Sequence, residues 1–342
     1  MSGQSLEQRL LRAWYGQARW LTLLRPLSWL YRRVVVRRRQ QYLSGERTQW
    51  QPPVPLIVVG NITLGGTGKT PMVIWLVEFL QSQGWRVGVI SRGYGATPPS
   101  LPWLVTPSDS AAVAGDEPLL IVQRCKVPLV IDPDRPAAAQ RLLSEGVDLI
   151  ISDDGLQHYA LGRSVELVLL DQQRDLGNRR CLPEGPLREP AERLQSVDLI
   201  VRNGASADGA KGYAMQLAPG VLVNLVSGER LAATRWSGPR QVSAMAGIGN
   251  PERFFSTLEA LAFECETYVF ADHARYDEQM LAALPANRPV LMTEKDAVKC
   301  TGLARDNWWY LSVDAQLSED FAAALLTLLP AAPQKGREPI QE

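Results

Sequence analysis

This chain of 342 residues has very few histidines and no closely spaced pair of cysteines. It holds two histidines, His158 and His273, and its four cysteines are scattered, with no CxxC pair and no metal-ligand spacing. Zinc sites and disulfide frameworks depend on such spacings, so neither is expected. The thiols are expected to stay reduced, as cytoplasmic thiols do.

A long apolar run is missing from the first 50 residues. A membrane-spanning helix needs about 20 mostly apolar residues. Here Arg19, Arg25, Arg32 and Arg33 interrupt every such window, with Pro26 among them. A secretory signal is not expected either, because no small-residue cleavage site follows a short apolar core.

Net charge is absent overall but unevenly placed. Lysine and arginine together number 36, as do aspartate and glutamate. Residues 1–50 hold ten arginines and two glutamates, a net charge of +8, so residues 51–342 sum to −8. One strongly basic end indicates contact with an anionic surface. Nucleic acid is not expected as that surface, because no nucleic-acid-binding motif occurs.

Bulky apolar residues alternate with the arginines of this basic end, among them Trp14, Trp20 and Trp29. Amphipathic side chains of this kind suit the headgroup layer of a bilayer, where one end stays dry and the other wet. Residues 1–43 are therefore predicted to form a membrane-associated helical segment that lies on an anionic leaflet. The alternative is an amphipathic helix packed on the body of the protein.

A phosphate-binding loop is the strongest motif in the sequence. The apolar run 55–60 has the length of a buried parallel strand, and a glycine-rich turn follows it before a helix begins. In this context glycines let backbone amides face phosphate oxygens. Lys69 is expected to reach the β- and γ-phosphates, and the Thr70 hydroxyl to hold Mg²⁺. The predicted nucleotide-binding residues are Gly65, Gly66, Thr67, Gly68, Lys69 and Thr70.

Two positions of this loop depart from related patterns. Thr63 stands where the G-x-x-x-x-G-K-[ST] motif has its first glycine. Leu64 stands where nucleotide-dimerised partitioning ATPases have a signature lysine, which argues against that class. No base-reading Asn-Lys-x-Asp motif occurs, so the choice between ATP and GTP stays open at this point.

Carboxylates follow a second buried strand. The run 147–152 ends in Asp153 and Asp154, and acids at such strand ends lie near nucleotide and Mg²⁺ in P-loop proteins. Adjacent side chains on a strand point apart, so one aspartate could serve the metal while the other organises water or substrate. The alternative is a helix cap or turn. Asp116 precedes a probable helix, and prolines flank a stiff Arg188–Glu189 pair.

Taken together, these motifs resemble the tetraacyldisaccharide 4′-kinase family of lipid A biosynthesis, over nearly the whole chain. The motifs that carry the resemblance are the loop 60–71, Ser91-Arg92-Gly93-Tyr94-Gly95, Gly115-Asp116-Glu117-Pro118, Asp153-Asp154-Gly155-Leu156-Gln157-His158, 185–190, 246–251, Asp272-His273 and Thr293-Glu294-Lys295-Asp296.

The resemblance implies transfer of the γ-phosphate of ATP, with Mg²⁺, to the 4′-hydroxyl of an acylated glucosamine disaccharide, giving lipid IVA. It also implies a place at the cytoplasmic face of the bacterial inner membrane; a monomer is expected. A lone histidine is more often structural than catalytic, but the resemblance pairs His273 with the base Asp116. The remaining implied residues are Asp153, Asp154 and Glu189 for Mg²⁺, and Ser91, Arg92, Tyr94, His158 and Arg188 for substrate.

Two positions depart from the family pattern. Leu156 replaces a residue that is more usually aromatic, and we expect the change to alter packing and not chemistry. Glu184 stands where a small residue is common before Gly185. If the acidic residue of the family aligned with Glu184, Glu189 would lose its role.

The spacing of apolar runs predicts an α/β protein with two domains. Strands are expected at 55–60, 86–90, 127–131, 147–152, 165–170 and 197–201, then at 240–245, 266–270, 289–293 and 308–313. Alternation with helices predicts a P-loop NTPase-like parallel sheet flanked by helices, followed by a second, smaller α/β domain. The predicted division is a segment 1–43, a kinase domain 44–203 with a linker beginning near 203, a closing domain 204–330 and a disordered tail 331–342.

Three other functions compete with a lipid kinase at this stage. A P-loop switch ATPase or GTPase would hydrolyse nucleotide regardless of lipid. A small-molecule kinase or ligase of the dethiobiotin-synthetase type leaves the basic end unexplained, and a membrane adaptor leaves the strand-end carboxylates without a role. Transfer of labelled γ-phosphate to a glucosamine lipid would separate all of these.

Overall fold

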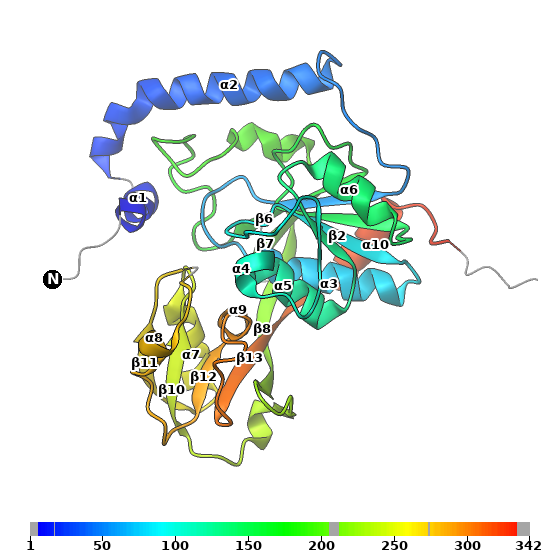
Figure 1. The fold of residues 1–342 in the computed structure, drawn as a ribbon. Coiled ribbons are helices and arrows are strands. Elements are labelled where there is room, and N and C mark those ends of the chain that lie inside the picture. The colour runs from blue at the N-terminus through cyan, green and yellow to red at the C-terminus, as the bar shows by residue number, and fades with distance from the viewer. Residues whose placement is uncertain (1–5, 17, 205–211, 273, 334–342) are drawn as a thin grey trace, which may run out of the picture.

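The computed structural model describes residues 6–16, 18–204, 212–272 and 274–333 (Figure 1). Within these residues one mixed sheet contains every assigned strand. Its first half consists of β1 (Leu56–Gly60), β2 (Val87–Ser91), β3 (Trp103–Val105), β4 (Leu129–Ile131), β5 (Leu149–Asp153), β6 (Val165–Asp171) and β7 (Leu199–Asn203). The second half consists of β8 (Tyr213–Asn224), β9 (Arg230–Ala232), β10 (Gln241–Ala246), β11 (Glu264–Val269), β12 (Val290–Thr293) and β13 (Trp308–Leu317).

The strand order is β11-β10-β12-β13-β8-β7-β6-β1-β5-β2-β4-β3, with β9 paired to β8. Strands β7, β6, β1, β5, β2 and β4 run parallel to one another, as do β11, β10, β12 and β13. All ten strands predicted from apolar runs are present, with ends shifted by four residues or fewer. The edge strand β3, the long β8 and the short β9 were not predicted from the sequence.

Helices cover both faces of the first half. On one face lie α3 (Lys69–Ser82), α5 (Asp116–Cys125) and α10 (Glu319–Thr327), and on the other α6 (Arg135–Leu143). Neighbouring residues of β1 serve opposite faces, since Ile57 packs in the first core and Val58 in the second. Such two-sided burial explains why these strands read as continuous apolar runs. A short α4 (Ala111–Ala114) precedes α5.

The second half has its own helices, α7 (Pro251–Ala260), α8 (Glu278–Leu281) and α9 (Glu294–Ala297). We call β1–β7 with α3–α6 and α10 the first lobe, and β9–β12 with α7–α9 the second lobe. The antiparallel pair β8 and β13 joins them (Figure 1).

This pair sets the direction of both lobes. The start of β8 pairs in parallel with β7, so the carboxyl end of β7 points along β8 toward the second lobe. The start of β13 pairs in parallel with β12, and β13 runs antiparallel to β8, so the carboxyl end of β12 points back toward the first lobe. The carboxyl-terminal edges of the two half-sheets therefore face each other. Ligand sites of open α/β sheets lie at such edges.

The predicted domain boundaries stay a prediction. Residues 205–209 of the predicted linker 203–209 and residues 334–342 of the predicted tail 331–342 lie outside the described residues. Helix α10 falls in the range assigned to the second domain, yet its Phe321 packs against Trp75 of α3 and Tyr213 of β8. The chain thus returns to the first lobe after β13.

The basic N-terminal end forms three helical segments: α1 (Leu6–Tyr15), a 3-10 turn η1 (Arg19–Leu24) and α2 (Arg25–Leu43). Polar side chains attach α2 to the loop that follows β6. Ser28 Oγ donates to the Cys181 carbonyl at 2.7 Å, and Tyr31 Oη donates to the Arg188 carbonyl at 2.9 Å. Within the described residues, every helix is too short or too polar to cross a bilayer.

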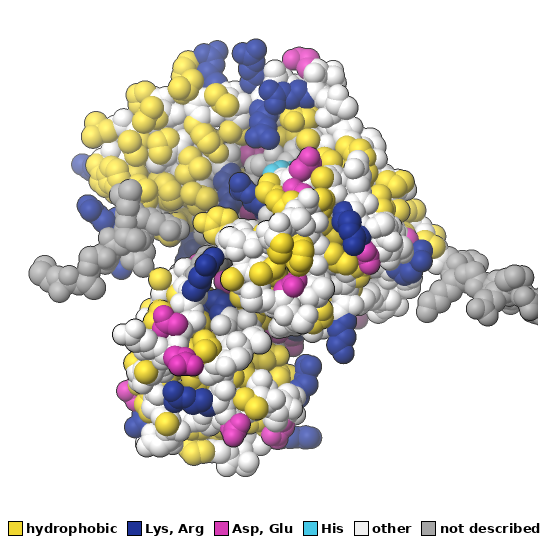
Figure 2. Space-filling view, viewed as in Figure 1, with side chains coloured by type: hydrophobic (Ala, Val, Ile, Leu, Met, Phe, Trp, Pro, Cys, Tyr) yellow, Lys and Arg dark blue, Asp and Glu magenta, His cyan; other side chains and the backbone are white. Residues whose placement is uncertain are grey.

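The side of η1 and of the first half of α2 that points away from the body is mainly apolar. Leu27, Leu30 and Val34 lie three and four residues apart and are each more than half exposed, and Leu23 is 81% exposed. Figure 2 shows hydrophobic side chains gathered over η1 and α2, with Lys or Arg side chains beside them. The helix is therefore held by polar contacts on its inner side and presents its apolar side to the surroundings.

Candidate active site

The predicted phosphate-binding loop connects β1 to α3 in the expected way. Gly65 and Gly68 have φ values of 108° and 90°, which other residues adopt only with strain. Among the described residues, the amides of residues 65–68 donate to no acceptor. A side chain added at Gly66 would meet no atom within 4 Å. A run of unused amides in an open loop at a helix N-terminus is suited to phosphate.

Lys69, the first residue of α3, points toward Asp154. Its Nζ lies 3.6 Å from Asp154 Oδ1. Arg188 Nη1 lies 3.2 Å and 3.1 Å from the two oxygens of the same carboxylate. Burial alone would raise the pKa of Asp154, but Lys69 and Arg188 lower it below its ordinary value. The carboxylate stays ionised and arranges both cations beside the loop.

Asp153, the last residue of β5, has a different environment. It is 3% exposed, its Oδ2 accepts from Ser91 Oγ at 3.3 Å, and its Oδ1 has no partner among the described residues. Burial, followed by the negative charges of Glu117 and Asp154, raises its pKa to about 7. The two aspartates thus point to separate partners, as their adjacency predicted.

Arg188 reaches this site because its loop pairs with the start of the phosphate-binding loop. The Leu64 amide donates to the Pro186 carbonyl at 2.9 Å, and the Arg188 amide donates to the Ile62 carbonyl at 2.7 Å. Thr63, the departure from the motif, is buried in this pairing opposite Leu187. The position thus serves packing against a neighbouring loop.

Glu189 points away from the phosphate loop. One of its oxygens accepts from Tyr159 Oη, and the other accepts from Gln157 Nε2 at 3.1 Å and lies 3.7 Å from Arg193 Nε. These partners indicate a structural role in this state, and a part in binding Mg²⁺ stays a prediction. Glu184 instead pairs with Arg25 of α2 at 3.1 Å.

His158 lies in the turn after Asp153 and Asp154. Burial, followed by the guanidinium groups of Arg135 and Arg92, lowers its pKa to about 4. Arg135, which the sequence did not single out, is 1% exposed and donates to the Asp153 carbonyl at 2.8 Å. Arg135 is the first residue of α6, four residues after β4. In the sequence it is marked only by the proline that follows it at the start of a helix, which does not predict a functional residue.

A half-open cavity of about 470 Å³ lies between the two lobes. Tyr94, Gly115 and Asp116 line it from the first lobe. Arg275, Tyr276, Val298, Lys299 and Thr301 line it from the second lobe. Asp116, at the start of α5, thus faces a space that both lobes shape, as a base for a bound hydroxyl would. His273 lies outside the described residues, so its pairing with Asp116 stays a prediction.

An ion pair beside this cavity links the lobes. Lys295 Nζ of α9 lies 3.2 Å from Glu117 of α5 and 3.4 Å from Asp272. Burial alone would lower the pKa of Lys295, but Glu117 and Asp272 raise it above its ordinary value. Neither Glu117 nor Lys295 was predicted as functional, although both lie in motifs that carry the family resemblance.

The residues present fit a magnesium ion. Mg²⁺ prefers oxygen ligands, chiefly carboxylates and phosphates. Asp153 offers a buried carboxylate oxygen that has no other partner in the described residues, and the Thr70 hydroxyl lies next to Lys69 at the start of α3. Thr70 and Asp153 thus offer oxygen atoms that suit Mg²⁺, and the part of Asp154 in binding the ion stays a prediction.

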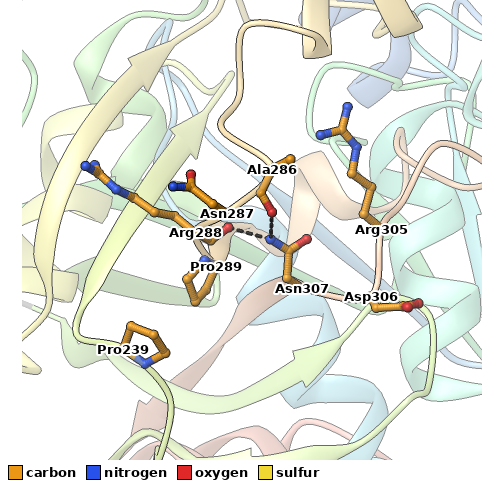
Figure 3. Close-up of a pocket in the computed structure, with 8 residues that line it drawn as sticks. All are labelled: Pro239, Ala286, Asn287, Arg288, Pro289, Arg305, Asp306 and Asn307. Carbon is orange, nitrogen blue, oxygen red and sulfur yellow. Dashed lines mark hydrogen bonds between the residues drawn. The ribbon is translucent and has the colours of Figure 1, made fainter.

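A second cavity, of about 510 Å³, lies elsewhere in the second lobe (Figure 3). Its walls come from the loops that lead into β10, β12 and β13, so it lies at the amino ends of these strands. Asn307 Nδ2 donates there to the carbonyls of Ala286 and Arg288. Its position opposite the facing edges separates it from the phosphate loop.

An open phosphate loop, an ionised aspartate between two cations and a cavity bordered by a further carboxylate define a P-loop phosphotransferase. The family model for tetraacyldisaccharide-1-P 4′-kinase (LpxK) matches residues 20–330. The chain belongs to this family.

Curated relatives and a solved structure agree. A tetraacyldisaccharide 4′-kinase of Pseudomonas fluorescens is 61% identical over 331 residues, covering 95% of this chain and 98% of that protein. One of Pseudomonas syringae pv. tomato is 60% identical, covering 93% and 96%. The crystal structure of LpxK from Aquifex aeolicus in complex with ATP matches with a TM-score of 0.77 and 27% identity, covering 91% of this chain and 99% of that one.

Proposed function

We propose that this chain performs the reaction of its family with the cleft residues described above. It is an ATP-dependent kinase, and it phosphorylates a lipid A precursor at the 4′ position. The acceptor is a tetraacylated glucosamine disaccharide 1-phosphate, and the product is lipid IVA. The observation that supports these roles is that Asp116 and the open phosphate loop belong to the same edge of the first lobe, facing the second lobe. Family membership disfavours the switch, the small-molecule ligase and the adaptor.

The phosphate loop binds ATP through the amides of residues 65–68 and Lys69. These groups are positioned before the nucleotide arrives, so they stabilise charge on the moving phosphoryl group without reorganisation. When bound, Mg²⁺ neutralises charge on the phosphate oxygens, and Thr70 and Asp153 would hold it. Asp154 keeps Lys69 and Arg188 oriented through its ionised carboxylate.

Asp116 accepts the proton of the 4′-hydroxyl as the oxygen of that hydroxyl bonds to the γ-phosphorus. The bond between that phosphorus and the β–γ bridging oxygen breaks, and ADP leaves with the electron pair. Arg92 and Arg188 meet phosphate oxygens. His273 would orient Asp116 or tune its basicity. Ser91, Tyr94 and His158 contact the sugar lipid, and closure of the lobes excludes water.

An assay with labelled γ-phosphate tests these roles. Asp116→Ala is expected to abolish transfer to the glucosamine lipid while ATP binding stays close to that of the parent. Lys69→Ala is expected to weaken ATP binding as well. Normal turnover by Asp116→Ala would remove this residue from the mechanism, and normal turnover by Lys69→Ala would remove the phosphate loop.

The apolar side of η1 and α2 supports a second part of the proposal, attachment to the bilayer. This side presents large apolar residues beside arginines, the combination that favours an anionic headgroup layer. The inner side is occupied by contacts with the loop after β6. The helix thus lies on the cytoplasmic face of the inner membrane and holds the active site near the lipid.

Point substitutions test this attachment better than removal of 1–43, which would uncover the loop beneath α2. The double variant Leu23→Glu/Leu30→Glu is expected to lose binding to vesicles that contain anionic lipid. Tyr31→Phe, on the inner side, is the matched control and keeps that binding. Unchanged vesicle binding by the double variant would contradict the proposal. A monomeric state stays a prediction.

A further inference from the structure

Two buried asparagines approach the phosphate loop from different strands. Asn203, the last residue of β7, is 3% exposed, and its Nδ2 donates to the Thr67 carbonyl at 3.1 Å. Asn61 follows β1 and is fully buried; its Nδ2 lies 3.4 Å from the Gly65 carbonyl oxygen and 3.4 Å from Thr67 Oγ1. Neither residue has been given a role by the reaction described above.

These contacts determine where the loop amides point. In a trans peptide the carbonyl of one residue and the amide of the next point in opposite directions. A donor that fixes the Thr67 carbonyl therefore turns the Gly68 amide to the other side of the loop. The contact of Asn61 with the Gly65 carbonyl does the same for the Gly66 amide. Both amides lack an acceptor in the described part of the chain.

The donor is the functional part of each asparagine. In both side chains the Oδ1 atom is buried and accepts no hydrogen bond from a described residue. A carbonyl can only accept, so the amide nitrogen of Asn203 must face Thr67. Asn203 also lies close to Gly68, where an added Cβ would come within 2.7 Å of its Nδ2. The side chain therefore fits against the loop at the peptide that it holds.

We propose that Asn203, assisted by Asn61, is a positioning residue that aims the Gly68 and Gly66 amides at the phosphates of ATP. Asn203 has the larger effect, because its contact is shorter than those of Asn61. The inference rests on the proposed binding of ATP by the loop. It adds that the glycines alone do not determine the geometry of the loop. The side chains of Asn61, after β1, and of Asn203, at the end of β7, also hold it in place.

The test compares Asn203→Asp with Asn224→Asp in the full-length protein. Asn203→Asp keeps the size of the side chain but removes the donor and places an acceptor against the Thr67 carbonyl. Asn224 is the matched control: it is 5% exposed, and its Nδ2 donates to the Asp306 carbonyl at 2.7 Å at the end of β8 that lies away from β7. Each variant is measured for ATP affinity by titration and for thermal stability.

Asn203→Asp is expected to weaken ATP affinity by about ten- to a hundred-fold, the range for losing the hydrogen bond from the Gly68 amide to a charged phosphate oxygen. Asn224→Asp is expected to lower the melting temperature without changing ATP affinity. Asn203→Ala, which adds no charge, provides the same test if the aspartate variant does not fold. Parental ATP affinity in a folded Asn203 variant would overturn the inference, whereas failure of the parent itself to bind ATP would instead overturn the proposed function.

Discussion

The amides of residues 65–68 at the carboxyl-terminal edge of the first lobe have no acceptor among the described residues, whereas the facing edge of the second lobe supplies its own anion. There the Gly247 amide, which follows β10, donates to Asp296 Oδ2 at 2.9 Å. Both edges are built from parallel strands, and both have a glycine after a strand. The difference is that a carboxylate of the protein accepts a hydrogen bond from the loop amide in the second lobe, and none among the described residues does so from the amides of residues 65–68 in the first lobe. Unused amides in the first lobe and occupied ones in the second support the proposal that nucleotide binds to the first lobe.

Asp296 is the centre of the second edge. It is fully buried, and it accepts from Thr293 Oγ1 at 2.6 Å and from Tyr276 Oη at 2.8 Å. Lys299 Nζ lies 2.7 Å from its Oδ1. Burial, followed by the charge of Asp296, raises the pKa of Tyr276 well above its ordinary value. The Asp296 carboxylate thus connects the end of β10, the start of α9 and Tyr276. Tyr276 lines the cavity between the lobes, across from Asp116, so Asp296 holds that side of the cavity in place.

The largest expected effect comes from removing the carboxylate that occupies the carboxyl-terminal edge of the second lobe. Asp296→Ala leaves Lys299, which is 4% exposed on its side chain, without its counter-charge. Removing one partner of a buried ion pair costs about 3–5 kcal/mol. Chemical denaturation monitored by circular dichroism is expected to show that loss. A loss below about 1 kcal/mol would mean that the two edges do not differ in the way described.

Asp153→Asn, at the carboxyl-terminal edge of the first lobe, is expected to reduce activity but not stability. The buried Oδ1 of Asp153, which has no partner among the described residues, is the oxygen that we propose to bind Mg²⁺. The turnover number is expected to fall by about a hundred-fold or more, while the melting temperature without Mg²⁺ stays the same or rises. Full activity in this variant at saturating Mg²⁺ would exclude Asp153 as a metal ligand.

A pair of glycine substitutions compares the two edges directly. A methyl group at Gly247 would clash with the Tyr276 hydroxyl, so Gly247→Ala is expected to destabilise the protein by about 1–3 kcal/mol. At Gly66 the same group meets no atom within 4 Å, so Gly66→Ala is expected to change the unfolding free energy by less than about 0.5 kcal/mol. Equal losses in thermal denaturation would remove the distinction between a closed and an open edge.

The last expected effect concerns pH and is the smallest at neutral pH, because it develops only as the pH falls. The folded pKa of His158, about 4, lies below its ordinary value, so the unfolded chain takes up the proton first as the pH falls. The stability that neutral His158 contributes is present above about pH 6.5 and is lost as the pH falls toward about 4. The variant His158→Gln has no imidazole to protonate, so it does not lose this stability. As the pH falls, its unfolding free energy should rise relative to that of the parent by at most about 1.4 kcal/mol per pH unit. A pH-independent difference would contradict the burial of this imidazole.

Local sequence determined the elements that carry the chemistry. The apolar run before Gly60 and the glycines up to Lys69 predict strand, loop and helix without reference to the rest of the chain, because backbone freedom and burial period are local properties. The same holds for the strand that ends at Asp153. The resemblance then supplied the reaction and the acceptor, which the family match confirms.

Only the tertiary structure determined which side chains meet. Nothing local shows that Asn203 would bond to Thr67, 136 residues away, or that Glu189 would be occupied by Tyr159 and Gln157. The facing of the two edges depends on β8, whose interrupted apolar pattern concealed it from sequence reasoning. The physical reason is that burial and hydrogen bonding between distant segments depend on strand order and direction, which one stretch of sequence does not specify.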